Sequence, residues 1–183
     1  MDTQFEIIVN EKVSMRLLNE SDAEAMFNCI DFNRDFFRKY LYWVDKTESV
    51  NDSLLKIQQD MENYRSGESL ELGVFYKNCF VGRCGFHKIG KLNLEIGYFL
   101  HENMNGQGIM TQCVKTLTQY GFDSLKKHRV VIKMDVDNKA SKAIAEKLGF
   151  TLEGIERESN FNCDGGWRNS FVYSFLSTDT FRV

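Results

Sequence analysis

The stretch from Asn103 to Thr111 constrains this chain more than any other, because it sets two glycines between a strand-like run and a helix-like run. Gly106 and Gly108 allow the backbone to turn tightly and allow a ligand to approach without meeting a Cβ atom. The next residues, through Leu125, have the pattern of a helix, whose first N–H groups have no partner within it. Such a helix start favours anions, phosphate above all. No Lys or Arg lies between Glu102 and Thr111, so we expect backbone amides to hold the ligand.

Three kinds of phosphate-binding loop resemble this stretch, and an unliganded turn between a strand and a helix is the fourth interpretation. A P-loop needs a Lys-Ser/Thr pair after a longer glycine frame, and the Lys is absent. A dinucleotide-binding fingerprint needs a third glycine where Thr111 stands, although Asp135 does end the next predicted strand. The third kind is the pyrophosphate loop of acetyl-CoA-dependent N-acetyltransferases, (Gln/Arg)-x-x-Gly-x-(Gly/Ala). Here it has Asn103 in the first place and both glycines in theirs.

A second pattern lies one helix and one strand further along the chain. The run Val130–Val136 is strand-like, Asn138 stands where a helix N-cap is preferred, and Gly149 stands where a short helix would end. The sequence Asn-x-x-Ser-x-x-x-x-Glu-Lys-Leu-Gly-Phe, which begins at Asn138, resembles the second signature of the same acetyltransferases, the GNAT superfamily. Two signatures in the right order are far more specific than either one alone.

Both ends of the chain are similar to one branch of that superfamily, the bacterial ribosomal-protein N-terminal acetyltransferases of the RimJ/RimL type. The similar parts are residues 15–23, residues 152–158, residues 164–168 and Tyr173. The resemblance covers almost the whole chain and implies one N-acetyltransferase domain over residues 1–183. It also implies a mixed α/β fold of the α+β class. Its central sheet would be mixed and mostly antiparallel, with about seven strands, a splayed central pair and helices on both faces.

The order of predicted elements favours such a mixed sheet on its own. These elements are a strand at Val13–Leu18, a helix capped by Ser21 and running to about Ile30, a helix within Thr47–Tyr64, a hairpin of Leu70–Tyr76 and Cys79–His87 around Lys77-Asn78, and a central strand at Leu92–Leu100. After Leu100 the predicted order is helix, strand, helix, strand, strand. Because the first half looks antiparallel, a doubly wound dinucleotide-binding fold is disfavoured.

Composition excludes several classes of protein. With 183 residues and 43% hydrophobic content, the chain fits one globular domain with a full core. No apolar run approaches the length of a membrane span, and the first residues lack the pattern of a signal peptide, so we expect a cytoplasmic protein. The five cysteines form no C-x-x-C pair and the three histidines are scattered, which predicts reduced thiols and no metal site. A net charge of −3 argues against nucleic-acid binding.

The resemblance implies that acetyl-CoA lies where the strands Asn93–Leu100 and Val130–Val136 splay apart. The pantetheine arm would run along Phe99–His101, the pyrophosphate would sit on Gly106–Thr111, and Asn138 would hold a cofactor amide. The implied cofactor-binding residues are Phe99, Leu100, His101, Asn103, Gly106, Gln107, Gly108, Ile109, Met110, Thr111, Asn138 and Ser141. Without the resemblance, Asn138 is simply a helix cap and Ser141 a solvent-facing hydroxyl.

The implied reaction is direct attack of an amine on acetyl-CoA. It needs a neutral amine, hydrogen-bond donors for the oxyanion, and a donor for the departing thiolate. Many relatives supply the last with a Tyr where this chain has Ala145, so Ser141 is the residue expected to donate to the sulfur. The base is open: some relatives carry a glutamate where this chain has Asn160. Glu158, Glu102 and Glu95 remain as carboxylates that could hold a water.

Because no strong base is evident in the sequence, an α-amine acceptor is favoured. An α-amine titrates about 2.5 pH units below lysine, so its neutral form costs about 3.5 kcal/mol less. We therefore predict acetyl transfer to the N-terminal amine of a protein, a ribosomal protein being the first choice. The alternatives are a small-molecule N-acetyltransferase, acting on a polyamine, an amino-acid conjugate or an antibiotic, and a non-catalytic acyl-CoA-binding protein. No nucleic acid or membrane partner is expected, and relatives suggest a homodimer or a higher homo-oligomer.

Overall fold

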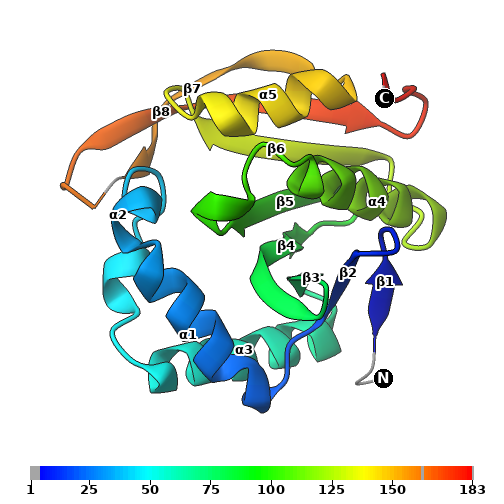
Figure 1. Cartoon of the computed structure of the whole chain (residues 1–183). Helices are drawn as coiled ribbons and strands as arrows, with labels where there is room; N and C mark the ends of the chain where they lie inside the picture. Colours follow the sequence, from blue (N-terminus) through cyan, green and yellow to red (C-terminus); the bar gives the residue numbers. More distant parts are fainter. Residues whose placement is uncertain (1–4, 162, 183) are drawn as a thin grey trace.

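The computed structural model describes residues 5–161 and 163–182, and it is built on one eight-stranded sheet in the order β1-β2-β3-β4-β5-β6-β8-β7 (Figure 1). The strands are β1 (Glu6–Ile8), β2 (Val13–Leu17), β3 (Leu70–Tyr76), β4 (Cys79–Ile89), β5 (Asn93–Leu100), β6 (Arg129–Asp135), β7 (Thr151–Phe161) and β8 (Trp167–Leu176). Among the described strands, β5 and β6 pair in parallel and every other pair is antiparallel. The mixed, mostly antiparallel sheet is confirmed. The sheet has one strand more than the seven expected. The additional strand is β1, whose three residues are too few to show an alternating pattern in the sequence.

Helices cover both faces of this sheet, as expected (Figure 1). They are α1 (Ala23–Phe32), α2 (Arg34–Phe37), α3 (Val50–Ser66), α4 (Ile109–Asp123) and α5 (Lys139–Leu148), with short 3-10 turns η1 (Glu20–Asp22), η2 (Val44–Lys46) and η3 (Glu102–Met104). On one face, Gly121 of α4 sits so close to Leu94 and Phe86 that a Cβ there would lie 2.5 Å from Leu94. On the other face, α3 reaches the sheet through Asp60, which accepts a hydrogen bond from buried Arg83 of β4.

Local capping rules explain both ends of α5, and one predicted cap needs correction. Asn138 accepts a hydrogen bond from the Ser141 N–H at 3.0 Å and so caps α5, and Gly149 ends α5 with a φ of 93°. The prediction that Ser21 caps the first helix is wrong. Asn19 instead caps the 3-10 turn η1, in a reciprocal capping box with Asp22, and Ser21 donates to the Asn19 side chain. Helix α1 follows η1 directly and has no side-chain cap of its own. The expected hairpin is confirmed, since Lys77 and Asn78 both have positive φ, as a type I′ turn requires.

The two central strands separate halfway along their length. Within the described chain, the pairing of β5 with β6 ends at Ile96 and Ile132. Beyond that point β5 stays bonded to β4 as far as Leu100, and β6 stays bonded to β8 as far as Asp135. The expected splay is therefore confirmed. It leaves main-chain groups of Gly97–Leu100 facing a gap between the two strands.

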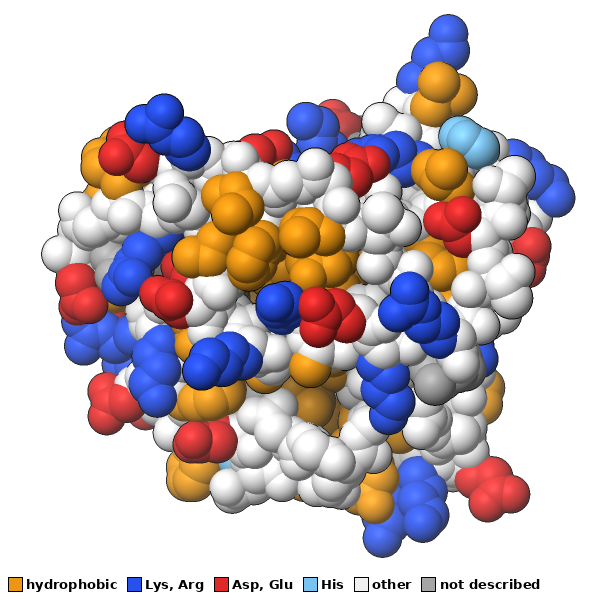
Figure 2. All heavy atoms as spheres, turned by 90° about the horizontal axis from the view of Figure 1, so that it is seen from above, with side chains coloured by type: hydrophobic (Ala, Val, Ile, Leu, Met, Phe, Trp, Pro, Cys, Tyr) orange, Lys and Arg blue, Asp and Glu red, His pale blue; other side chains and the backbone are white. Residues whose placement is uncertain are grey.

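Several large hydrophobic side chains are exposed on the last two strands. Figure 2 shows the face above α5 and the last two strands, where hydrophobic side chains gather among charged ones. The large hydrophobic side chains most exposed on β7 and β8 are Leu152, Ile155, Phe161 and Trp167.

All five cysteines are free thiols, of which Cys29, Cys84 and Cys113 are buried. In the described residues, no helix is both long and apolar enough to span a membrane.

Candidate active site

Two adjoining cavities open at the splay between β5 and β6. The first, which we call the splay cavity, has a volume of about 200 Å³ and reaches from Trp43 across Gly97 to Asn160. The second, the α5 cavity, has a volume of about 410 Å³ and runs between the first turn of α5 and Phe99 and Leu100. The residues that line both cavities are Tyr40, Leu41, Tyr98, Asn138 and Ser141. These shared residues mark the place where the two cavities meet.

The start of α4 has the geometry of an anion cradle. Gly106 and Gly108 have φ values of 75° and 76°, in the left-handed region that glycine tolerates. A Cβ on Gly106 would meet nothing within 4 Å, so the turn leaves room for a ligand against the backbone. The side chains of Ile109 and Met110 are buried in the core, so their N–H groups, not their side chains, are what this helix start can offer. The residues present therefore fit a pyrophosphate.

The start of α5 presents a pair of hydroxyl groups. Tyr98 of β5 places its hydroxyl 2.7 Å from the Ser141 Oγ. Burial raises the pKa of Tyr98 above its ordinary value, so its hydroxyl stays protonated. It can therefore donate to Ser141, which leaves the Ser141 proton free to point into the cavity. Sequence reasoning missed Tyr98. The only signal was its place on the same strand face as Ile96 and Leu100.

Replacing Asn138 by alanine should remove both the cap of α5 and an amide that lines the cavities. Loss of an N-cap side chain costs about 1 kcal/mol of folding free energy, so we expect a lower melting temperature together with weaker acetyl-CoA affinity. Asn138→Asp is the matched control, since aspartate caps equally well but has no N–H to donate. Thermal unfolding and calorimetry of both variants separate the two roles. Unchanged affinity in both variants would show that Asn138 is only a cap.

An aromatic segment before α3 lines the site. Phe37 packs edge-on against Phe99 with ring centroids 5.1 Å apart, and Trp43 lies 5.7 Å from the same ring. The Tyr40 hydroxyl donates to the Asp137 carbonyl at 3.2 Å, which ties this segment to the turn before α5. Within this segment Phe37 is buried in the core, and Tyr40 and Trp43 line the splay cavity.

The remaining residues predicted to bind the cofactor lie along the path from β5 to α4. Phe99 and Leu100 line the α5 cavity. His101 belongs to the lining of neither cavity. Its N–H donates to the Val81 carbonyl and its ring stacks on Phe32. Asn103 and Gln107 are exposed and joined by a hydrogen bond from the Gln107 side chain to the Asn103 carbonyl. Thr111 is half-buried in the first turn of α4.

The candidate bases lie in different surroundings. Glu95 is half-buried on β5, and the hydrogen bond it accepts from His87 holds its pKa below its ordinary value. Glu158 is exposed on β7, where its N–H is held by the Asn169 side chain, and it belongs to the lining of neither cavity. Glu102 is exposed in η3. Asn160 does line the splay cavity, so the position where some relatives carry a glutamate holds an amide that cannot take a proton.

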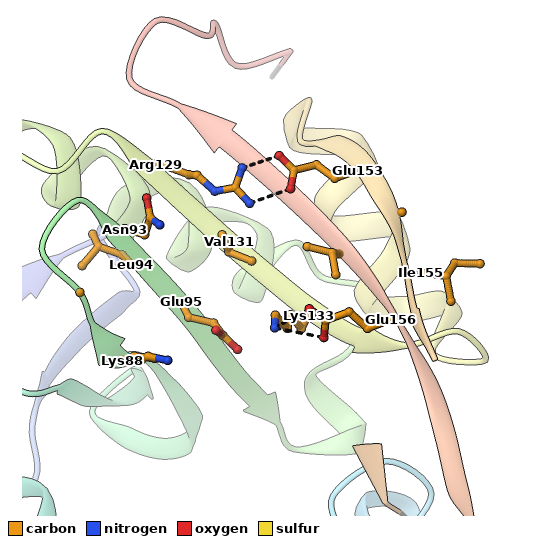
Figure 3. Close-up of a pocket in the computed structure, with 13 residues that line it drawn as sticks. Lys88, Asn93, Leu94, Glu95, Arg129, Val131, Lys133, Glu153, Ile155 and Glu156 are labelled. Atoms are coloured by element: carbon orange, nitrogen blue, oxygen red, sulfur yellow. Dashed lines mark hydrogen bonds and ion pairs between the residues drawn. The ribbon is translucent and has the colours of Figure 1, made fainter. Parts of the chain in front are cut away.

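A third and larger cavity continues from the splay along the sheet. This sheet groove has a volume of about 490 Å³ and is lined by residues of β4, β5, β6, β7 and β8. Figure 3 shows its charged side chains arranged in pairs, Arg129 with Glu153 and Lys133 with Glu156, with Glu95 on the neighbouring strand. Lys133 lines both the groove and the splay cavity, so the two are adjacent.

Comparison with known proteins agrees with this geometry. Residues 12–151 match the family model described as acetyltransferase (GNAT) domain. The ribosomal N-acetyltransferase candidate YdaF of Bacillus subtilis (strain 168) is 30% identical over 174 residues, which is 93% of this chain and 94% of YdaF. The ribosomal-protein-serine acetyltransferase of Escherichia coli (strain K12) is 29% identical over 157 residues, 85% of this chain and 88% of that protein.

Solved structures with the same fold hold the cofactor. RimL, a ribosomal L7/L12 α-N-protein acetyltransferase in complex with coenzyme A, superposes with a TM-score of 0.90 at 27% identity, over 94% of this chain and 98% of RimL. The microcin C7 self-immunity acetyltransferase MccE, in complex with acetyl-CoA and AMP, gives a TM-score of 0.88 at 32% identity, over 92% of this chain and 94% of MccE. The chain therefore belongs to the GNAT acetyltransferase family and is an N-acetyltransferase that uses acetyl-CoA.

Proposed function

We propose that this protein is a single-domain enzyme that acetylates the N-terminal α-amine of a protein, with a ribosomal protein as the first candidate. The observation that carries the proposal is Asn160 in the splay cavity, because an amide stands where some relatives carry a glutamate, so that position supplies no carboxylate base. An α-amine needs such a base least. The names of the relatives in Escherichia coli and of RimL support a ribosomal acceptor, and a cytoplasmic location fits it.

Each part of the site takes one role in this proposal. The pyrophosphate of acetyl-CoA lies on the N–H groups of the Gly106–Thr111 turn, and the pantetheine arm runs through the α5 cavity beside Phe99 and Leu100. Asn138 holds a cofactor amide at the meeting point of the cavities. Ser141, backed by Tyr98, donates to the sulfur as the thiolate leaves. The peptide chain behind the acceptor amine runs along the sheet groove away from the splay.

A small amine joined to a nucleotide is the second candidate acceptor. MccE, at 32% identity, was solved with AMP beside acetyl-CoA. In this chain Tyr40, Tyr42 and Trp43 line the splay cavity, and aromatic side chains of this kind stack on nucleobases. The two candidates differ in the group attached to the amine, so the same assay separates them when it includes an aminoacyl nucleotide analogue.

Peptides with a free, small N-terminal residue should be acetylated at least about tenfold faster than N-blocked peptides that offer only lysine, because at neutral pH far less of a lysine amine is neutral. The rate with the free peptides should rise towards the α-amine pKa, near 8. A thiol-release assay with acetyl-CoA measures both rates. Faster reaction of the blocked lysine peptide would contradict the α-amine acceptor, and faster reaction of the aminoacyl nucleotide analogue would favour the second candidate.

A further inference from the structure

A histidine that no sequence motif marks lies beside the splay. His87 of β4 places its Nε2 3.1 Å from the Glu95 Oε1 of β5. On its other side, the His87 Nδ1 lies 2.9 Å from the point where a Cβ on Gly97 would stand. Gly97 lines the splay cavity. The imidazole therefore lies over a bare stretch of β5, at the edge of the cavity where the acceptor amine must meet the thioester.

A β-bulge aims the imidazole at this place. In the pairing of β4 with β5, Phe86 lies opposite Ile96 and Lys88 lies opposite Glu95, so His87 is the extra residue between them. Bulges of this kind redirect a side chain and occur often beside active sites. The absence of a side chain at Gly97 completes the arrangement, because a Cβ there would push the ring away.

The hydrogen bond to Glu95 fixes the tautomer. The pKa of Glu95 lies below its ordinary value, chiefly because of the bond from His87, so the carboxyl group is ionised and can only accept. The neutral imidazole must then carry its proton on Nε2, which leaves the lone pair of Nδ1 free on the side of Gly97. Two charged groups from the neighbouring strands face this pair, Lys133 on β6 and Lys88 on β4.

We propose that His87 is the base that takes a proton from the acceptor ammonium, with Glu95 as the residue that orients it. The Nδ1 lone pair accepts one proton, and the amine lone pair then forms the C–N bond to the thioester carbonyl carbon. The C–S bond breaks as the tetrahedral intermediate collapses. The second amine proton leaves with it and neutralises the CoA thiolate. The imidazolium, stabilised meanwhile by the Glu95 carboxylate, returns its proton to water.

This division of roles explains why Glu95 alone is a poor choice for the base. A carboxylate whose pKa is lowered holds a proton less readily. The Nδ1 lone pair of the imidazole, in contrast, lies on the side of Gly97, which lines the splay cavity. The side chain of His87 is 45% exposed, which leaves it accessible to a substrate or a bridging water. A carboxylate also orients a histidine base in hydrolases that have a catalytic triad, although there the carboxylate bonds Nδ1 and Nε2 takes the proton.

His87→Gln should slow acetylation of a free N-terminal peptide about tenfold at pH 7, because on the order of one α-amine in ten is already neutral there. At pH 9 the amine is neutral without help, so the variant should come within about twofold of the wild type. Gly97→Ala should reproduce the loss at pH 7 by displacing the ring. Free imidazole should restore activity to His87→Ala but not to His87→Gln, which fills the space.

The matched control is His128→Gln, which removes an exposed histidine that contacts Ser177 instead of the splay; its rate should not change. Equal loss at pH 7 and pH 9, or no loss at either, would overturn the assignment. The inference uses the proposed α-amine acceptor only to set the pH window. If the wild type acetylates only a lysine peptide, the proposed function fails, and His87→Gln should then converge with the wild type only near the lysine pKa of about 10.4.

Discussion

Replacing Gly108 by valine should abolish measurable binding of acetyl-CoA, with affinity lowered at least about 100-fold, or about 2.7 kcal/mol. Gly108 has a φ of 76° and is the N-cap residue of α4, so in the proposed site its Cα stands where the pyrophosphate would approach the first N–H groups of the helix. A valine side chain fills that approach. Calorimetry with acetyl-CoA and with CoA measures the effect. Unchanged affinity would remove the Gly106–Thr111 turn from the site.

The same substitution also strains the backbone, because a left-handed conformation costs a residue with a Cβ roughly 1–2 kcal/mol. Gly67→Val controls for this strain. Gly67 ends α3 with a φ of 77°, and a Cβ there would meet nothing within 4 Å, while a Cβ on Gly108 would meet only the Gln112 Nε2, at 4.0 Å. That variant should lose stability to a similar degree and still bind acetyl-CoA. Loss of binding in both variants would mean that strain, rather than the ligand's approach, explains the result.

Replacing Ser141 by alanine should lower kcat on the order of 100-fold and leave the Kd for acetyl-CoA nearly unchanged. A hydrogen bond that strengthens only as the thiolate forms stabilises the transition state without aiding ground-state binding, and one such donor is typically worth about 3 kcal/mol. The Ser141 N–H still donates to Asn138 in the variant, so α5 keeps its cap. Steady-state kinetics and calorimetry on the same preparation separate the two quantities.

Two further variants sharpen that result. Tyr98→Phe removes the partner of the Ser141 hydroxyl and should lower kcat in the same direction by a smaller factor, because the serine remains. Ser53→Ala removes a buried serine hydroxyl from α3 and should leave kcat unchanged. If Ser141→Ala instead weakened acetyl-CoA binding as much as it slowed turnover, Ser141 would be a ground-state contact and not a donor to the leaving sulfur.

Features set by local rules could be predicted from the sequence. The Asn138 cap, the Gly149 helix end and the Lys77-Asn78 hairpin each depend on a few neighbouring residues, and each is confirmed. Where two residues compete for one local role, the pattern alone selects the wrong one. Asn19 outcompetes Ser21 because Asp22 stands three residues after it and completes the capping box.

The contacts that build the site join residues far apart in the chain, and the sequence carries little sign of them. Tyr98 and Ser141 are separated by 43 positions and meet because β5 and α5 flank the same splay. His87 and Glu95 are closer in sequence, but simple alternation along β4 does not place them together. They meet through a bulge, which shifts the register of one strand by a residue.

A competition within one molecule decides whether the acceptor is an α-amine. A single peptide that has both a free small N-terminal residue and an internal lysine is incubated with acetyl-CoA and the enzyme, and fragmentation mass spectrometry then locates the acetyl group. Because both amines are present at the same concentration, the comparison does not depend on peptide affinity or enzyme quality. We expect the acetyl group on the α-nitrogen, with Ser141→Ala giving the same product more slowly. An acetyl group on the lysine side chain instead would show that the α-amine is not the acceptor.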